Sequence, residues 1–248
     1  MFSVLMCCNR DDGFLDEALQ SVLKQTYEDF EFLIILNNCS DELYKKILNV
    51  DDPRIVVHRT KIGQLSFNLN YGINLASRAY IVRFDADDIC HPDRLKETHK
   101  ILTSDSEIDI IAGSCRLIND KGAVIGNVDL SKSLNWRSVL LRKNPFIHPA
   151  LALRTDLIIK SRGYMGGFHS EDYELWLRMS DNENIKVAFT NFQMIDYRIS
   201  EHQARGSKLG YAEVASYFLK RALLKPTLKN GCSVILSLYK FYFKGENK

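Results

Sequence analysis

Three aspartates fall within four residues in the segment VRFDADDICHPDRL. They are Asp85, Asp87 and Asp88, and they directly follow an apolar run at 79–84. Crowded carboxylates repel one another, and the pKa of each rises unless a cation is near. Oxygen ligands suit Mg²⁺ or Mn²⁺, and Mg²⁺ binds through one or two carboxylates together with substrate phosphates. Asp85 and Asp87 can therefore work together, one on a metal and one on the ribose of a nucleotide.

A purely structural interpretation, without a metal, also fits these aspartates. An isolated Asp-x-Asp is short and common, so it can be a solvated loop in which Asp88 caps the following helix.

A second acidic pair, Glu171 and Asp172, follows Ser170 at the start of a helical pattern. With Ser170 as the N-cap, both acids fall in the first turn, where the helix dipole favours negative charge. From the residues alone, this pair could either stabilise the helix or take part in catalysis.

The elements that must position these acids alternate regularly along the first hundred residues. Strand-like apolar runs and helical spacing follow one another, which predicts βαβ units on a parallel sheet. The runs are continuous, as expected of parallel strands buried on both faces. Ligands bind beyond the carboxyl ends of such strands, so NNCSDE (37–42) and the aspartates should share one rim. The predicted strands are 3–8, 30–36, 55–58 and 80–84, and the helices are 14–25, 42–48 and 66–77.

The rest of the chain predicts more mixed structure, without repeats or a long linker. We expect one α/β domain over 1–204, followed by a helical extension (205–248). The predicted elements after residue 92 are a helix at 93–103, two strands within 109–128, a strand at 150–154, a helix at 170–180, strands at 186–189 and 193–199, and helices at about 209–224 and 234–243.

Composition bounds the class of protein. Hydrophobic residues make up 46% and charged residues 26% of 248, an ordinary soluble composition. No apolar run approaches the roughly 20 residues that span a bilayer, and the N-terminus lacks a signal-peptide pattern. The six cysteines have no zinc or redox spacing, so we expect reduced thiols in a cytoplasmic protein.

Charge is distributed unevenly along the chain. Residues 205–248 carry nine Lys or Arg and two Glu, whereas the whole chain has a net charge of only +2. This basic extension predicts an anionic partner, and its interleaved aromatics favour a membrane surface, since no nucleic-acid motif is present. Packing on the domain, or on a second subunit in a homodimer, remains open. We therefore expect a cytoplasmic protein that can lie on the inner face of the cell membrane.

Several segments, in order and spacing, make the chain resemble family 2 glycosyltransferases, which are inverting enzymes with a GT-A fold. The segments are SVLMCCNRDDGFLDEALQSVLKQTYEDFEFLIILNN, LNYGINLASRAYIVRFDADDICHPDRL, NPFIHPALALR and GGFHSEDYELWLRM. The resemblance implies a Rossmann-like mixed sheet flanked by helices, with a nucleotide-binding half (1–104) and an acceptor-binding half (105–204). It also implies a nucleotide-sugar donor, a UDP-sugar in our interpretation, a saccharide or lipid-linked acceptor, and a Mn²⁺ or Mg²⁺ cofactor. The expected function is hexosyl transfer in surface polysaccharide or oligosaccharide biosynthesis.

The resemblance also assigns roles to single residues. Asp85 and Asp87 match the family's metal motif, with Asp87 as the direct ligand and Asp88 behind it. Asp172, beside Glu171, is the expected catalytic base. Cys8, Asn9, Arg10 and Arg83 are expected to bind the nucleotide, and His202 the metal or diphosphate. His148 and Trp176 match positions on the acceptor side, although we prefer a core role for Trp176.

The chain departs from the family pattern at three places. Asn37 and Asn38 stand where an Asp usually reads the base, although an amide can also pair with a pyrimidine. The segment Cys7-Cys8-Asn9-Arg10 stands in place of the family's Pro-x-Tyr-Asn, and His202 lies two residues beyond its expected position. Two rival functions remain: a sugar nucleotidyltransferase, although no Gly-rich phosphate loop follows the first strand, and a non-catalytic nucleotide-binding protein of the same fold.

Overall fold

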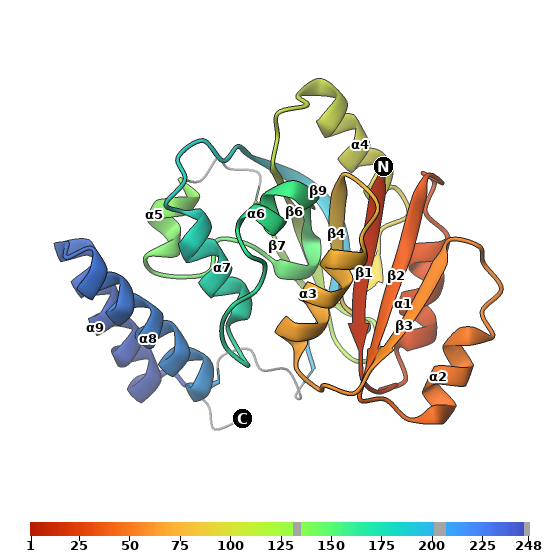
Figure 1. Ribbon diagram of the computed structural model, residues 1–248, viewed down its shortest axis with the longest axis horizontal. Helices are drawn as coiled ribbons and strands as arrows, with labels where there is room; N and C mark the ends of the chain where they lie inside the picture. The colour runs from red at the N-terminus through yellow and green to blue at the C-terminus, as the bar shows by residue number, and fades with distance from the viewer. Residues whose placement is uncertain (131–134, 201–206, 246–248) are drawn as a thin grey trace. The chain divides into compact units, whose positions relative to one another are not determined.

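The computed structural model describes residues 1–130, 135–200 and 207–245 (Figure 1). The chain divides into two compact units. The first comprises 1–133, 146–163 and 184–199, and the second comprises 134–145, 164–183 and 200–248.

The first unit is built on one mixed sheet. Its strand order is β3-β2-β1-β4-β8-β6-β9-β5, and β7 pairs with β6. The first four of these strands are mutually parallel, whereas β8 runs antiparallel to both β4 and β6, which confirms the predicted mixed sheet. The strands are β1 (Phe2–Cys8), β2 (Phe30–Asn37), β3 (Ile55–Thr60), β4 (Tyr80–Phe84), β5 (Ile89–Cys90), β6 (Ile110–Ile118), β7 (Val124–Val128), β8 (Leu151–Arg154) and β9 (Val187–Arg198).

Helices cover both faces of this sheet. Every residue of β1 is buried, as its continuous apolar sequence predicts. One face, including Val4 and Met6, joins the core that contains Leu15 and Ala18 of α1. On the other face Leu5 contacts Gly72 of α3, which lies in front of the strands in Figure 1. The helices of this unit are α1 (Leu15–Leu23), α2 (Asp41–Leu48), α3 (Leu65–Leu75), α4 (Arg94–Ser104), α6 (Thr155–Lys160) and the short 3₁₀ helix η1 (His148–Ala150).

Two predicted boundaries near the end of the chain differ from the structure. The strands predicted at 186–189 and 193–199 form one strand, β9, whose pairing with β6 shifts register after Gly113. Helix α9 (Leu228–Phe243) begins six residues before the predicted start, because the Thr227 hydroxyl accepts a hydrogen bond from the Asn230 N–H and caps it.

The second unit is helical in its described residues. Helices α8 (Lys208–Leu224) and α9 pack along each other as a hairpin, and they share this unit with α5 (Trp136–Leu140) and α7 (Glu171–Met179). The basic extension thus groups with two earlier segments, and the division that we expected at residue 204 stays a prediction. Among the described residues, no helix is both long enough and apolar enough to cross a membrane.

Candidate active site

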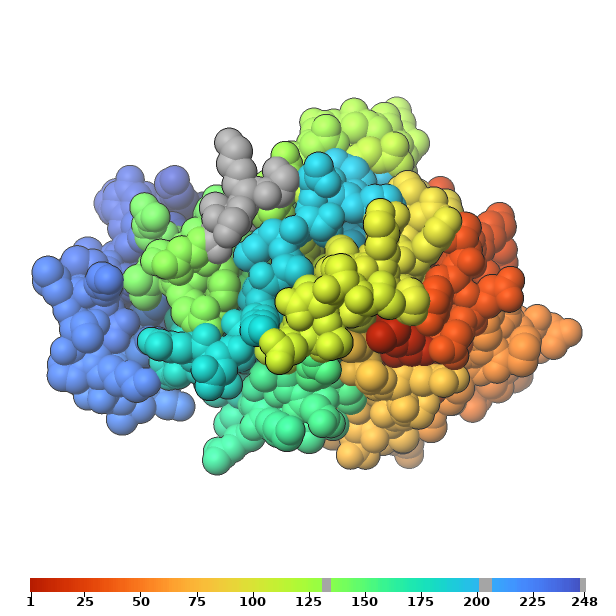
Figure 2. Space-filling view, turned by 90° about the horizontal axis from the view of Figure 1, so that it is seen from above, coloured from red at the N-terminus to blue at the C-terminus, as the bar shows by residue number. Residues whose placement is uncertain are grey.

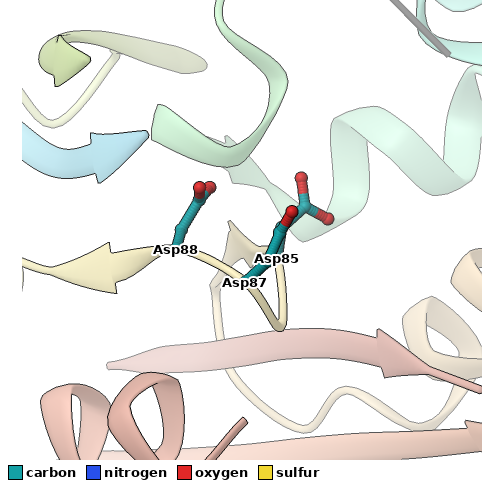
Figure 3. Close-up of side chains that lie close together, drawn as sticks. All are labelled: Asp85, Asp87 and Asp88. Carbon is teal, nitrogen blue, oxygen red and sulfur yellow. The ribbon is translucent and has the colours of Figure 1, made fainter. Parts of the chain in front are cut away.

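The aspartate cluster lies at the carboxyl end of β4, a strand that is buried along its whole length. One carboxylate oxygen from each of Asp85, Asp87 and Asp88 can be chosen so that all three lie within 4.8 Å of one another. Figure 3 shows the three side chains pointing to the same side of the turn between β4 and β5. The structure therefore brings together the carboxylates that the sequence pattern singled out.

Asp88 is the buried member of the cluster, with 1% of its surface exposed. Its Oδ1 accepts a hydrogen bond from the backbone N–H of Arg198 at 2.8 Å, whereas its buried Oδ2 has no hydrogen-bond partner among the described residues. Burial, reinforced by the charges of Asp85 and Asp87, raises the pKa of Asp88 well above its usual value. A buried carboxylate oxygen beside two further carboxylates fits a divalent cation, which would offset their repulsion.

Arg198 holds this turn in place, and sequence reasoning did not single it out. It is 1% exposed, and its Nε donates to the backbone carbonyl of Asp87 at 2.8 Å. Its Nη1 donates to the carbonyl of Asn119 at 3.0 Å, and its Nη2 pairs with Glu17 at 2.8 Å. The guanidinium also lies 4.0 Å from the centre of the Phe14 ring. One side chain at the end of β9 thus links the aspartate turn to two other segments.

Arg83 and His148 lie beside the cluster in the same unit. The buried Arg83 side chain forms an ion pair with Asp85 and donates to the carbonyl of Phe84. The segment η1 packs against β4. Burial and the nearby positive charge of Arg83 hold the pKa of His148 well below its usual value, so the imidazole is neutral near pH 7.

The residues after β1 border the same rim. Cys8 is buried, and its thiol donates to the carbonyl of Arg10 at 3.0 Å. Burial raises the pKa of Cys8 to about 11, so it is a neutral thiol and not an anion facing a diphosphate. Asn9 is exposed, and Arg10 forms an exposed ion pair of 2.7 Å with Asp12.

The two asparagines at the end of β2 differ in backbone geometry. Asn37 is 7% exposed as the last residue of the strand. Asn38 has a positive φ of 50°, a conformation that Asn tolerates better than most residues, and its N–H donates to the carbonyl of Thr60 at 2.9 Å. Because β2, β1 and β4 are parallel neighbours, both amides lie at the same edge of the sheet as the aspartates.

In the second unit, Asp172 occupies the first turn of α7. Its Oδ2 accepts a hydrogen bond of 2.6 Å from the Asn144 amide, and its Oδ1 accepts one of 2.6 Å from the Tyr173 N–H. Burial raises the pKa of Asp172, while Asn144, Tyr173 and the Trp176 side chain oppose that shift. A carboxylate held in this way has a defined orientation and a raised proton affinity. Its neighbour Glu171 is 8% exposed.

The start of α7 corrects one prediction. Ser170 is the N-cap residue, as expected, but its side chain makes no capping hydrogen bond. Its hydroxyl instead donates to Glu213 of α8 at 2.7 Å, and Glu213 also accepts from the N–H groups of Phe168 and His169. A carboxylate from a distant helix, which local sequence cannot reveal, therefore satisfies the groups in front of α7.

Two expected acceptor or metal residues remain. Trp176 is completely buried, so its ring has no face open to a sugar, and the burial supports the core role that we preferred. His202 lies outside the described residues. Tyr173, Leu177 and Met179 of the same helix are also buried.

Comparison with known proteins gives consistent matches. The family Glycosyl transferase family 2 matches residues 3–169. The chain is 36% identical to the O-antigen biosynthesis glycosyltransferase WbnJ of Escherichia coli, over 98% of this chain and 97% of that protein. It is 29% identical to the UDP-Gal:alpha-D-GlcNAc-diphosphoundecaprenol beta-1,3-galactosyltransferase of Escherichia coli, over 89% of this chain and 84% of that protein.

A solved structure shows the same fold. The crystal structure of S. aureus TarS 1-349 in complex with UDP-GlcNAc matches with a TM-score of 0.73 and 16% identity, over 98% of this chain and 73% of that chain. This likeness confirms the expected GT-A fold. The family match also selects the glycosyltransferase interpretation over the nucleotidyltransferase.

Proposed function

The chain belongs to glycosyl transferase family 2, and from that premise we propose that it moves a hexose from a UDP-sugar to a lipid-linked saccharide during surface polysaccharide synthesis. The observation that carries the proposal is the carboxylate cluster at the carboxyl end of β4, the edge where ligands of such sheets bind. The choice of donor and acceptor draws on a relative that is named for UDP-Gal and for a diphosphoundecaprenol acceptor.

The aspartate turn is proposed to hold the diphosphate end of the donor. Asp87 would be the direct ligand of a divalent cation, with Asp85 beside it and Asp88 behind them. When bound, Mn²⁺ or Mg²⁺ would neutralise the charge that the departing diphosphate gains. Arg198 keeps the turn in its conformation through the Asp87 carbonyl and the Asp88 carboxylate.

Asp172 is proposed to act as the catalytic base. It takes the proton of the acceptor hydroxyl while that oxygen forms a bond to the anomeric carbon, and the bond from this carbon to the diphosphate oxygen breaks. One displacement inverts the anomeric centre. The raised pKa of Asp172 favours proton uptake, while the Asn144 hydrogen bond fixes which oxygen points away from the amide.

The other rim residues are proposed to recognise the donor and acceptor. Asn37 and Asn38 would read the uracil edge, since an amide offers both a donor and an acceptor. The segment Cys8–Arg10 and Arg83 would border the nucleotide, and neutral His148 would face the acceptor. An acceptor attached to a membrane lipid requires the enzyme to work at a membrane surface, which we place on the cytoplasmic side.

A donor and acceptor panel tests this function. Purified protein is mixed with Mn²⁺ or Mg²⁺, with each of several UDP- and GDP-sugars, and with a synthetic GlcNAc-diphosphate-lipid acceptor. We expect one UDP-hexose to be consumed and the product to have the inverted anomeric configuration, measured by NMR. Turnover of a GDP-sugar alone would contradict the proposed donor, and a retained anomeric configuration would contradict the single displacement.

A further inference from the structure

We propose that the tip of the α8–α9 hairpin docks this protein on an anionic phospholipid bilayer, with leucines in the lipid and a lipid phosphate in the basic cavity beside them. The tip is defined here as residues 223–229. The inference deepens the proposed function, because it rests on the enzyme working at a membrane surface, but its physical basis lies in these helices alone. Their surface is the blue region of Figure 2.

Helix α9 exposes large apolar side chains to solvent. Its buried positions include the polar residues Asn230, Ser233 and Ser237, which are 6%, 3% and 5% exposed. Its exposed large apolar side chains recur at helical spacing, so they form one stripe. They are Leu228 (86% exposed), Ile235 (69%), Leu238 (44%), Tyr239 (51%), Tyr242 (70%) and Phe243 (74%). This is the reverse of a helix that covers a core, and it predicts an apolar partner for the outer face.

The most exposed part of this surface is the tip. Leu223 and Leu224 end α8 with 76% and 72% of their surface exposed, and Leu228 begins α9 only four residues later. The connection between the helices is the three-residue turn Lys225-Pro226-Thr227. Three large aliphatic side chains thus project from a short turn, a form that can enter a bilayer without spanning it.

Charge decides between a bilayer and a second copy of the chain. Within residues 207–245 there is one acidic residue, Glu213, against seven basic ones. A homodimer through this face would bring two surfaces of the same positive sign together, which is unfavourable. An anionic leaflet instead attracts each nearby Lys or Arg. The basic residues are Lys208, Lys220, Arg221, Lys225, Lys229, Lys240 and Lys244.

A cavity of about 340 Å³ lies beside the tip, and its charged lining residues are all basic. They come from three elements of the second unit and from the turn: Arg137 of α5, Arg221 of α8, Lys225 and Lys229. The buried Nε of Arg221 has no hydrogen-bond partner among the described residues. Asp181 pairs with Arg221 at 2.7 Å and with Lys225 at 3.0 Å, which leaves one carboxylate against four cations.

A phosphate diester fits this lining because it is a single anion with several acceptor oxygens. Asn135, Ser138 and Thr227 add polar side chains to the cavity wall. Since Lys225 follows Leu224 and Lys229 follows Leu228 in the chain, the cavity and the apolar tip adjoin. A lipid therefore matches both features at once, with its acyl region at the leucines and its phosphate at the cations.

Vesicle flotation of the full chain tests the proposal. Phosphatidylcholine vesicles are compared with vesicles that also contain phosphatidylglycerol. We expect binding only to the anionic vesicles, release by added salt, and at least a tenfold loss of affinity in Lys229→Glu and in the double variant Leu224→Ser/Leu228→Ser. Matched changes on exposed residues of α2, Lys45→Glu and Leu48→Ser, should bind as wild type. Equal binding to both vesicle types, or to neither, would overturn the proposal.

Three further readouts separate the other occupants. Titration with inorganic phosphate shows whether the cavity serves a free anion: phosphate binding that Lys229→Glu abolishes, without vesicle binding, would overturn the docking role. Sedimentation that shows a dimer lost in Leu224→Ser/Leu228→Ser would assign the face to a second copy. Sugar transfer to a water-soluble acceptor should be unchanged in all tip variants, so failure of docking is distinguishable from failure of the proposed catalysis.

Discussion

The hydrogen bond from Asn144 to Asp172 gives the sharpest prediction about catalysis. Replacing Asn144 with Ala removes a 2.6 Å donor to the proposed base and leaves its burial in place. A hydrogen bond to a charged group contributes about 1.5–3 kcal/mol, and one pKa unit corresponds to about 1.4 kcal/mol. Asp172 is only partly shielded from solvent, which favours the lower end of this range. We therefore expect Asn144→Ala to raise the pKa of Asp172 further, with a loss of up to about tenfold in rate at low pH.

The assay is the pH dependence of kcat/KM for sugar transfer. A base must be deprotonated, so activity falls as pH drops through its pKa. In Asn144→Ala the acidic limb should move to higher pH, with up to about a tenfold loss of rate on the limb and a small change on the plateau. The exposed amide of Asn182 offers a control, and Asn182→Ala should leave the limb in place. A uniform loss of rate with an unmoved limb would refute the assignment of Asp172 as the titrating base.

Two further predictions concern the aspartate turn. Asp87→Ala should lower the rate of transfer by about 10²-fold or more, because a bound metal supplies several kcal/mol of stabilisation to the transition state. The control Asp51→Ala, which changes an exposed acid on a turn, should leave the rate unchanged. Full activity of Asp87→Ala in excess chelator would contradict the metal site. Arg198→Lys keeps the positive charge but loses the guanidinium fork that reaches the Asp87 and Asn119 carbonyls. The metal affinity measured by titration should therefore weaken about 10- to 100-fold. An unchanged affinity would show that Arg198 does not support the site.

Continuous apolar runs made much of this fold predictable. The strands β1, β2 and β4 are buried along nearly their whole length, so their sequences are apolar throughout and stand out from the helices between them. Because parallel strands end at one edge, the position of the aspartates after β4 followed from the strand order alone. The placement of Glu171 and Asp172 at a helix start followed from the local pattern.

The partners that hold these acids could not be predicted in the same way. Arg198 is 1% exposed, yet an arginine in a sequence is ordinarily interpreted as surface charge. Asn144 lies in a segment without periodicity, and it reaches Asp172 only after the chain has folded. Glu213 satisfies Ser170 across 43 positions of sequence, which no local capping rule can anticipate. A hydrogen-bond partner that is distant in sequence is a property of tertiary structure, and Arg198, Asn144 and Glu213 are three such partners.

The role of Asp172 as the base of a UDP-sugar transfer reaction is tested most directly by removing its charge. Asp172→Asn keeps the size of the side chain but removes its ability to take a proton. Donor binding, measured by calorimetry, and transfer to the lipid-diphosphate acceptor should be followed in parallel, with Glu171→Gln as the neighbouring comparison. We predict that Asp172→Asn binds UDP-sugar as wild type while transfer falls by about 10²–10⁴-fold, the range for general base catalysis. Transfer that persists in Asp172→Asn and is lost in Glu171→Gln would show that Glu171, and not Asp172, is the base.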